Sequence, residues 1–386
     1  MGARFENCKW FCGVLTLFCA GAGHPATPKF ELAVHCPPSF VLQNGVCRLK
    51  TAYLQFASLQ NAGVGGLKTG LPKFRDGFTP AEIDLGRYLF FDPVLSRNGQ
   101  VSCATCHDPN QGFSDGLPQS RGVLGTPIAR NAPSLWNVAF LSRFFWDGRA
   151  RSLEEQAQGP LFERREMGHS QESLLTALNS IATYRQLFLQ TFGDAQHRIE
   201  LQHVTRALAA FESSLISLGS RYDLYALSLD PSALSERELV GLNVFRSFVA
   251  RCAECHTPPL FTNQQMAVLG TPEPTGHPFD VGAATIFSEP TLRGGFKVPS
   301  LRNVQRSAPY MHSGRFASLK EVVEFYNGGR GHAVPAGEKL LLHWHISSPK
   351  LSEHERACLV EFLGALTDES FKPERPKTLP SGLVPH

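Results

Sequence analysis

The pentapeptide Cys-x-x-Cys-His occurs twice in the chain, at residues 103–107 and 252–256. This spacing is the attachment signature of c-type haem, because two thiols three residues apart can add to the two vinyl groups of one porphyrin. The adjacent histidine then reaches the iron from the proximal side. A structural zinc site would need four nitrogen or sulfur ligands at each motif, and a thioredoxin-like motif would need a βαβ context. The sequence therefore predicts two covalently bound haem c groups, held by Cys103, Cys106 and His107 and by Cys252, Cys255 and His256.

The composition favours helices joined by long loops. The 386 residues leave room for two or three domains, and 27 prolines and 34 glycines accompany few alternating apolar runs. With 37 basic and 34 acidic residues, the net charge of +3 gives no indication of binding to nucleic acid or to an anionic membrane. We expect an all-α fold in which the porphyrins supply much of the core.

The first two dozen residues have the pattern of an export signal. Arg4 and Lys9 precede an apolar run over residues 10–20, and small residues follow at 20–23. The run is too short for a membrane span, and no other stretch could cross a bilayer, so no transmembrane segment is expected. A lipoprotein attached through Cys19 is disfavoured, because Phe18 stands where a small residue is wanted. We expect residues 1–23 to be a signal peptide and the protein to be periplasmic, which agrees with haem attachment outside the cytoplasm.

The remaining cysteines divide into three groups. Three of them leave with the signal peptide: Cys8, Cys12 and Cys19. Cys36 and Cys47 flank a turn-rich segment and could close a small disulfide loop in an oxidising compartment. Cys358 lies in an apolar helical segment and is expected to be an inert buried thiol.

The chain contains an internal repeat. Each haem motif follows a helix with a capping box, Thr79–Glu82 before a helix over 81–91 and Ser235–Glu238 before a helix over 239–248. Aligning Pro133 with Pro299 gives an offset of 166 residues that continues without a gap over more than twenty positions. We infer a duplication, with an N-terminal extension at 24–77, a first domain at 78–225, a second domain at 226–372 and a C-terminal tail at 373–386.

The repeat allows the two distal haem positions to be compared. At the offset of 166, Tyr326 falls on Pro160, so one half offers a phenol oxygen where the other offers a side chain that cannot coordinate iron. No His or Met occurs between His107 and Pro160, and we expect the first haem to have an open distal face. Met311 and Met266 are alternative ligands for the second haem.

The chain resembles the bacterial dihaem cytochrome c peroxidase superfamily, and within it the MauG-like branch, over residues 78–367. The resemblance rests on both haem motifs, on Arg-Asn-Ala-Pro-Ser-Leu-Trp-Asn at 130–137, on Phe-Trp-Asp-Gly-Arg-Ala at 145–150, and on the segment 300–314. It implies two cytochrome c-like domains, each with one haem. It also implies a calcium ion between them, bound by Asn131 and by the backbone carbonyls of Ser307 and Pro309.

The resemblance implies roles for further residues. Trp146 is similar to the tryptophan that lies between the haems as an electron relay, and three residues are similar to the distal pocket of the peroxide-reactive haem: Gln156, Pro160 and Glu166. Standard peroxidases have a Met where Tyr326 stands and a His in the loop where this chain has Val123. Both departures match the MauG-like branch, to which the methanobactin-associated MbnH enzymes are related.

Each assignment has a simpler alternative. Tyr326 and Trp146 could be core aromatics, and Glu166 and Gln156 could be solvated surface residues. His312 is expected to form a local hydrogen bond. His343 and His345 form a loose surface candidate for a stray metal, and no role is assigned to two other histidines, His24 and His169.

We therefore predict an exported dihaem oxidoreductase. Hydrogen peroxide would react at the His107 haem, and oxidising equivalents would pass through Trp146 to the haem ligated by His256 and Tyr326, for long-range oxidation of a partner protein. One alternative is a peroxidase that detoxifies hydrogen peroxide with electrons from a small cytochrome c or a cupredoxin. A second is a dihaem electron carrier, which would need fixed protein ligands on both faces of both irons.

Overall fold

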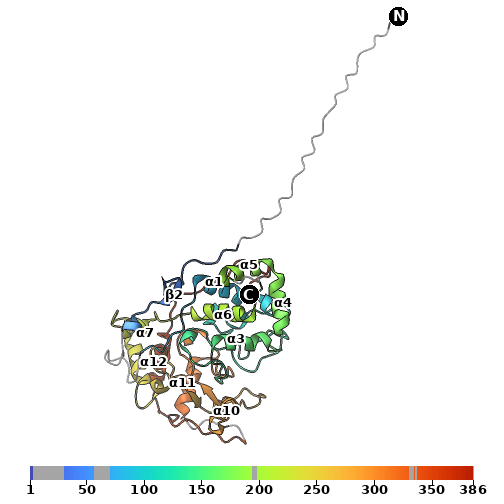
Figure 1. Cartoon of the computed structure of the whole chain (residues 1–386). Helices are drawn as coiled ribbons and strands as arrows, with labels where there is room; N and C mark the ends of the chain where they lie inside the picture. Colours follow the sequence, from blue (N-terminus) through green and yellow to red (C-terminus); the bar gives the residue numbers. More distant parts are fainter. Residues whose placement is uncertain (3–29, 56–69, 194–197, 330–333, 335–336, 386) are drawn as a thin grey trace.

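The computed structural model describes residues 1–2, 30–55, 70–193, 198–329, 334 and 337–385, and it is mainly helical with two small sheets (Figure 1). Nearly all of the predicted signal peptide lies outside these residues. Within them, no helix is both long enough and apolar enough to cross a membrane.

The first half of the chain is built around two helices that cross closely. A Cβ atom on Gly86 of α1 would overlap the carbonyl oxygen of Ala207 in α6, so only glycine permits this approach. Apolar residues from both helices, such as Leu89 and Phe211, form the buried core. The helices of this half are α1 (Pro80–Phe91), α2 (Cys103–Cys106), α3 (Leu153–Phe162), α4 (Gln171–Ser180), α5 (Ala182–Phe192) and α6 (Leu201–Ser213).

The second half repeats this crossing. A Cβ atom on Gly241 of α8 would overlap the carbonyl oxygen of Cys358 in α12. Cys358 itself is fully buried, as predicted. The helices of this half are α7 (Arg221–Ala226), α8 (Glu236–Phe245), α9 (Cys252–Cys255), α10 (Ala284–Phe287), α11 (Leu319–Gly328) and α12 (Glu353–Gly364).

Short elements complete the chain. The two antiparallel sheets pair β1 (Phe40–Gln43) with β2 (Val46–Leu49), and β3 (Met266–Val268) with β4 (Gly295–Lys297). The 3₁₀ helices are η1 (Ala52–Gln55), η3 (Pro93–Leu95), η4 (Pro109–Gln111), η5 (Val138–Phe140), η6 (Pro290–Leu292) and η7 (Val304–Arg306). The expectation of an all-α chain is thus correct for the main elements and misses two short sheets.

The offset of 166 residues relates structural elements as well as residues of the sequence. It relates η5 to η7 and α3 to α11, and it relates the isolated bridge Phe144–Ala150 to the bridge Tyr310–Phe316. Asn137 and Asn303, also 166 apart, both have positive φ, at 62° and 57°. The predicted repeat is therefore present in the structure.

Two predicted helices have boundaries that need correction. The helix predicted over 239–248 is α8, which begins at Glu236 because Ser235 is its N-cap and Glu238 is already its third residue. It ends at Phe245, three residues earlier than predicted. Similarly, α1 begins at Pro80, directly after its N-cap Thr79.

The N-terminal extension forms a disulfide-closed hairpin that contacts both halves. The predicted bond between Cys36 and Cys47 is present. Phe40 of the hairpin belongs to one buried apolar cluster with Phe140 of the first half and Leu260 of the second. The hairpin thereby packs against both halves through one shared apolar cluster.

Candidate functional site

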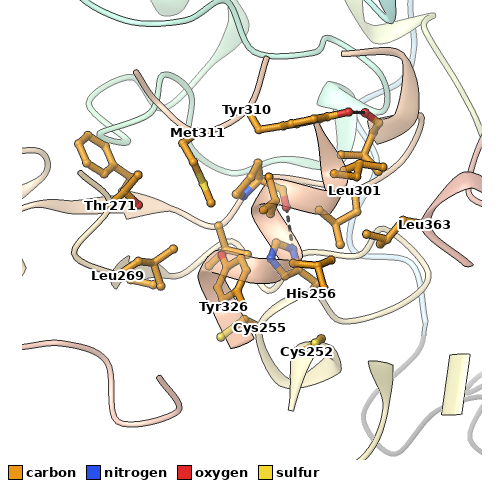
Figure 2. Close-up of a pocket in the computed structure, with 18 of the residues that line it drawn as sticks. Cys252, Cys255, His256, Leu269, Thr271, Leu301, Tyr310, Met311, Tyr326 and Leu363 are labelled. Carbon is orange, nitrogen blue, oxygen red and sulfur yellow. Dashed lines mark hydrogen bonds between the residues drawn. The ribbon is translucent and has the colours of Figure 1, made fainter. Parts of the chain in front are cut away.

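Two cavities of similar size hold the two predicted haem-attachment motifs, one in each half. The first has a volume of about 250 Å³ and is lined by Cys103, Cys106 and His107. The second has a volume of about 230 Å³ and is lined by Cys252, Cys255 and His256 (Figure 2).

The proximal histidines are oriented by backbone carbonyls. His107 Nδ1 lies 2.9 Å from the carbonyl oxygen of Phe113, and His256 Nδ1 lies 3.1 Å from that of Phe261 and 3.2 Å from that of Pro299. A carbonyl only accepts hydrogen bonds, so Nδ1 carries the proton and the Nε2 lone pair is free to bind a metal. Burial lowers the pKa of both imidazoles, that of His256 to about 4. Two thiols beside a neutral imidazole fit the requirements of a c-type haem in both cavities.

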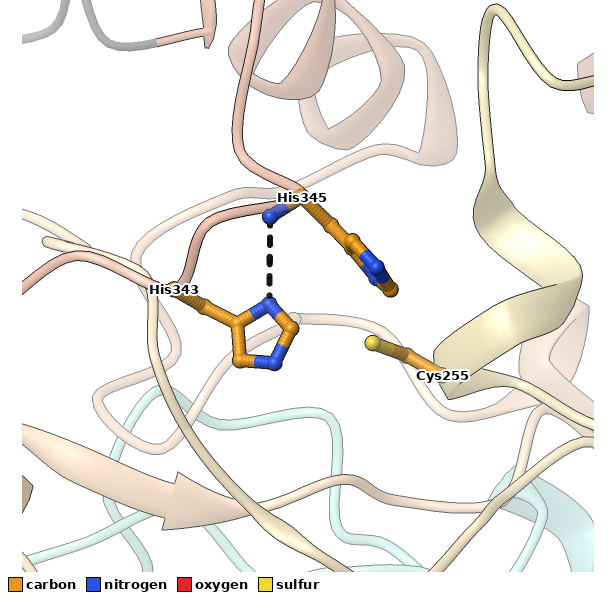
Figure 3. A group of neighbouring side chains, drawn as sticks. All are labelled: Cys255, His343 and His345. Atoms are coloured by element: carbon orange, nitrogen blue, oxygen red, sulfur yellow. Dashed lines mark hydrogen bonds between the residues drawn. The ribbon is translucent and has the colours of Figure 1, made fainter.

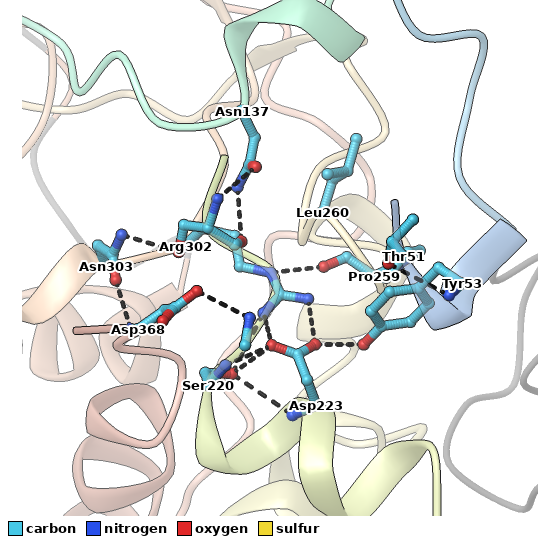
Figure 4. Close-up of polar contacts among 12 residues, drawn as sticks. Thr51, Tyr53, Asn137, Ser220, Asp223, Pro259, Leu260, Arg302, Asn303 and Asp368 are labelled. Carbon is cyan, nitrogen blue, oxygen red and sulfur yellow. Dashed lines mark hydrogen bonds and ion pairs between the residues drawn. The ribbon is translucent and has the colours of Figure 1, made fainter. Parts of the chain in front are cut away.

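A buried ionic network supports the loop behind His256 (Figure 4). The guanidinium of Arg302 donates to both carboxylate oxygens of Asp223, at 2.5 and 2.7 Å, and to the carbonyl oxygen of Pro259 at 2.7 Å. The hydroxyl of Tyr53, from the N-terminal extension, donates to the same carboxylate. This network holds the segment that includes Pro299, one of the two carbonyl partners of His256. In the first half the position of Arg302 is occupied by Trp136, which packs edge-on against Phe113.

The predicted distal residues of the first haem are brought together in one cavity. Gln156 and Pro160 project from α3, and Glu166 follows that helix. Glu166 is partly buried, and burial, together with nearby Glu163, raises the pKa of its carboxyl, although Arg149 and Arg165 oppose the rise. Glu166 is therefore not a fully solvated surface charge.

Met167 also lines this first cavity, and the sequence interpretation did not consider it. It follows Pro160, and so it lies beyond the stretch that contains no His or Met. Its side chain belongs to the apolar core of the first half, together with Leu161 and Leu174.

Tyr326 and Met311 both line the second cavity (Figure 2). Tyr326 projects from α11, and burial raises the pKa of its phenol, with a smaller contribution from the neighbouring thiols of Cys255 and Cys252. Met266 is not among the lining residues, because it lies on β3 and its methyl group packs on Gly148. Of the two alternative methionine ligands, only Met311 is placed to reach the cavity.

Trp146 lies at the boundary between the cavities and lines both of them. Its indole nitrogen donates to the carbonyl oxygen of Asn131 at 2.9 Å, and its own carbonyl accepts from the backbone nitrogen of Lys297 at 2.7 Å. The residues of the predicted calcium site, Asn131, Ser307 and Pro309, line the second cavity as well. Their role in binding calcium stays a prediction.

His343 and His345, predicted as a loose surface candidate for a metal, are half-buried at the wall of a cavity and not on the open surface. Both imidazoles line the second cavity, and one ligand atom of each lies with the sulfur of Cys255 in a group spanning no more than 4.8 Å (Figure 3). The backbone of His343 donates to the carbonyl of Val268 in β3, which places this segment against the cavity. Only the intervening Trp344 is well exposed.

Two other histidines have structural partners. His312 lies 2.8 Å from the carboxylate of Glu273, as the predicted local hydrogen bond requires. His169 is buried, with Nδ1 2.8 Å from the hydroxyl of Ser173.

Two buried ionisable residues were missed by the sequence interpretation. Glu212, on α6, lines the first cavity, and burial raises the pKa of its carboxyl to about 8, with a further contribution from Glu154. The sequence did contain a signal for the burial of Glu212. It lies four residues after the apolar Leu208, and residues at this spacing share one helix face. Lys297, on β4, lines both cavities, and nothing in its sequence neighbourhood indicated this position.

Sequence comparison relates the chain to di-haem peroxidases and to MauG proteins. The sequence model of the di-haem cytochrome c peroxidase family matches residues 80–230. Methylamine utilization protein MauG from Methylorubrum extorquens is 38% identical over 292 residues, which cover 75% of this chain and 79% of that protein. Cytochrome c551 peroxidase from Nitrosomonas europaea is 36% identical over 251 residues, covering 64% of this chain and 73% of the peroxidase.

Two solved structures are similar over most of their length. A MauG-like protein associated with microbial copper homeostasis is 31% identical, with a TM-score of 0.70, covering 76% of this chain and 91% of that one. The diheme peroxidase BthA from Burkholderia thailandensis is 25% identical, with a TM-score of 0.67, covering 92% of this chain and 99% of the other.

Proposed function

The chain belongs to the di-haem cytochrome c peroxidase family, whose members are oxidoreductases acting on peroxide, and we propose that it is a MauG-like member. In this proposal it uses hydrogen peroxide to oxidise a partner protein at a distance. The observation that carries the proposal is the difference between two equivalent helix positions. Tyr326 lines the second cavity at the position where Pro160 lines the first.

The residues of each cavity would hold one haem, which supplies a redox-active iron when bound. The cysteine pairs would hold the porphyrin, and His107 and His256 would each offer a neutral Nε2 to the iron. In the second cavity Tyr326 would offer its phenol oxygen to the iron. A phenolate is a hard anionic donor and stabilises oxidised iron, whereas a methionine thioether favours reduced iron.

In the first cavity, Pro160 offers no donor atom, which leaves room for peroxide. Cleavage of the O–O bond requires a proton to move from one peroxide oxygen to the other, and a carboxyl within hydrogen-bond reach can carry it. Glu166 suits this role because burial raises its pKa toward the range in which it can both accept and release a proton. Gln156 can orient the peroxide through hydrogen bonds but cannot carry the proton.

Trp146 would connect the two cavities electronically. It lines both, and its backbone and indole hydrogen bonds fix its position. Oxidising equivalents generated in the first half would thus reach the second half and leave there toward the partner protein. We further propose a periplasmic location and a calcium ion bound by Asn131 and the carbonyls of Ser307 and Pro309.

The second candidate function is a peroxidase that draws electrons from a small cytochrome c or cupredoxin. The relatives support it about as well as the first candidate, since the peroxidase from Nitrosomonas europaea is 36% identical and MauG from Methylorubrum extorquens 38% identical to this chain. A dihaem electron carrier is less well supported, because Met167, the one methionine that lines the first cavity, is packed in the apolar core.

The state in which the protein reacts distinguishes the two main candidates. A MauG-like enzyme with an open first haem should consume hydrogen peroxide while it is fully oxidised. Stopped-flow absorption of the oxidised protein measures this reaction. A peroxidase of the standard type should need prior reduction by one electron. If peroxide is consumed only after such reduction, the second candidate is the correct one.

A further inference from the structure

We propose that Lys297 binds a haem propionate at the boundary between the two cavities, and that both haems experience its charge. The inference rests on the proposed function only in requiring a haem in each cavity. It assigns a ligand-binding role to a residue outside the attachment and distal sets.

The position of Lys297 is shared between the two halves. It is the last residue of β4, it is only 9% exposed, and it lines both cavities. Its backbone nitrogen donates to the carbonyl oxygen of Trp146 at 2.7 Å, which places it beside the tryptophan that separates the cavities.

Lys297 differs from the other cations around the cavities in having no carboxylate partner. Arg130 pairs with Asp147 and Asp280, both at 2.6 Å, and Arg149 pairs with Asp147 at 2.8 Å. Arg251 pairs with Glu254 at 2.8 Å. Among the described lysines and arginines that line either cavity, Lys297 alone forms no ion pair.

A buried ammonium without a partner is unfavourable, because burial removes its hydration and nothing replaces it. Burial accordingly lowers the pKa of Lys297 to about 8, so the side chain still carries its charge at neutral pH. An anionic group supplied by a ligand would offset the free energy lost when the ammonium is removed from water. The propionates are the carboxylates that each haem brings into its cavity, and an ammonium pairs well with a carboxylate.

The charge of Lys297 has a predictable electrical effect. A cation close to a haem favours the ferrous over the ferric state, since reduction adds one negative charge to the iron centre. The side chain borders both cavities, so its removal should lower the midpoint potentials of both haems.

The test is a spectroelectrochemical titration of the haem-loaded protein and of Lys297→Gln. The matched control is Lys320→Gln, which removes a lysine from the exposed surface of α11 in the same half. We expect a downward shift of both midpoint potentials in Lys297→Gln, wild-type potentials in Lys320→Gln, and largely restored potentials in Lys297→Arg, which keeps the charge.

Other outcomes overturn the inference in distinguishable ways. A shift of only one potential would exclude the shared role, and a shift no larger than that of Lys320→Gln would exclude propionate binding. If Lys297→Gln does not accumulate, Lys297→Met and Lys297→Arg provide the same neutral-against-charged comparison. Haem content, measured by pyridine haemochrome absorption, separates the failures: fewer than two haems in the wild type contradicts the proposed function, whereas two haems with unmoved potentials contradict only the role of Lys297.

Discussion

Pro160 and Tyr326 occupy the same position in two equivalent helices, and each faces the cavity of its own half. The helices α3 and α11 begin at Leu153 and Leu319, each directly after a serine N-cap. The same backbone position therefore presents a ring without a donor atom in one half and a phenol in the other. A duplicated scaffold has in this way become a pair of unlike sites.

The first prediction concerns the resting protein. Because Pro160 offers no ligand, the oxidised haem-loaded protein should show one high-spin and one low-spin ferric haem by electron paramagnetic resonance. Met167→Leu is the matched control, since it removes the one sulfur that lines the first cavity apart from the attachment cysteines. The high-spin signal should be unchanged in this variant. Two low-spin signals in the wild type, with one lost in Met167→Leu, would show that Met167 closes the site.

The second prediction concerns proton transfer. Glu166→Gln keeps the volume of the side chain and removes its proton-carrying group, so peroxide should still bind while O–O cleavage slows by about 10²–10⁴-fold. Glu172→Gln removes an exposed carboxylate of the next helix, α4, which does not contribute to the pKa of Glu166, and it should leave the rate unchanged. Single-turnover stopped-flow kinetics measure both. Equal rates in the wild type and both variants would show that Glu166 does not transfer the proton.

The third prediction concerns the second iron. Replacing the anionic oxygen of Tyr326 by a thioether in Tyr326→Met should raise the midpoint potential of the second haem and leave that of the first nearly unchanged. Tyr310→Phe is a suitable control, because Tyr310 lines the same cavity but donates its hydroxyl to the carbonyl of Val304. An unchanged potential in Tyr326→Met would mean that Tyr326 is a core aromatic and not a ligand.

The fourth prediction concerns the pH dependence of stability. Burial raises the pKa of Glu212 from its ordinary value of 4.5 to about 8, so between these values the folded chain holds a proton that the unfolded chain has released. The free energy of unfolding should therefore fall as pH rises through this window, by about 1.4 kcal/mol for each pH unit.

Glu212→Gln cannot lose a proton and should lack this fall. Its advantage over the wild type should grow from about pH 5 to pH 8, as measured by denaturant unfolding of the haem-loaded protein. Parallel pH profiles for the wild type and the variant would contradict a buried neutral Glu212.

The sequence predicted best the features that depend on local pattern. The attachment motifs, the capping boxes at Thr79 and Ser235 and the repeat offset are all readable within short windows. The pairing of Cys36 with Cys47 is equally local, since a short hairpin brings the two together.

The features that escaped prediction depend on packing between distant segments. Lys297 reaches both cavities because β4 hydrogen-bonds to Trp146, about 150 residues earlier in the chain. His343 and His345 line a cavity because their segment hydrogen-bonds to β3. No periodicity in the sequence of either segment encodes such a contact.

The disulfide-closed hairpin has a consequence for rates. None of its described residues lines either cavity, yet Phe40 packs in one cluster with Phe140 and Leu260, which belong to different halves. The separation of the two redox centres is therefore held in part by a segment that touches neither. Electron tunnelling slows steeply as separation grows, so this peripheral hairpin helps to set how fast charge crosses the interior.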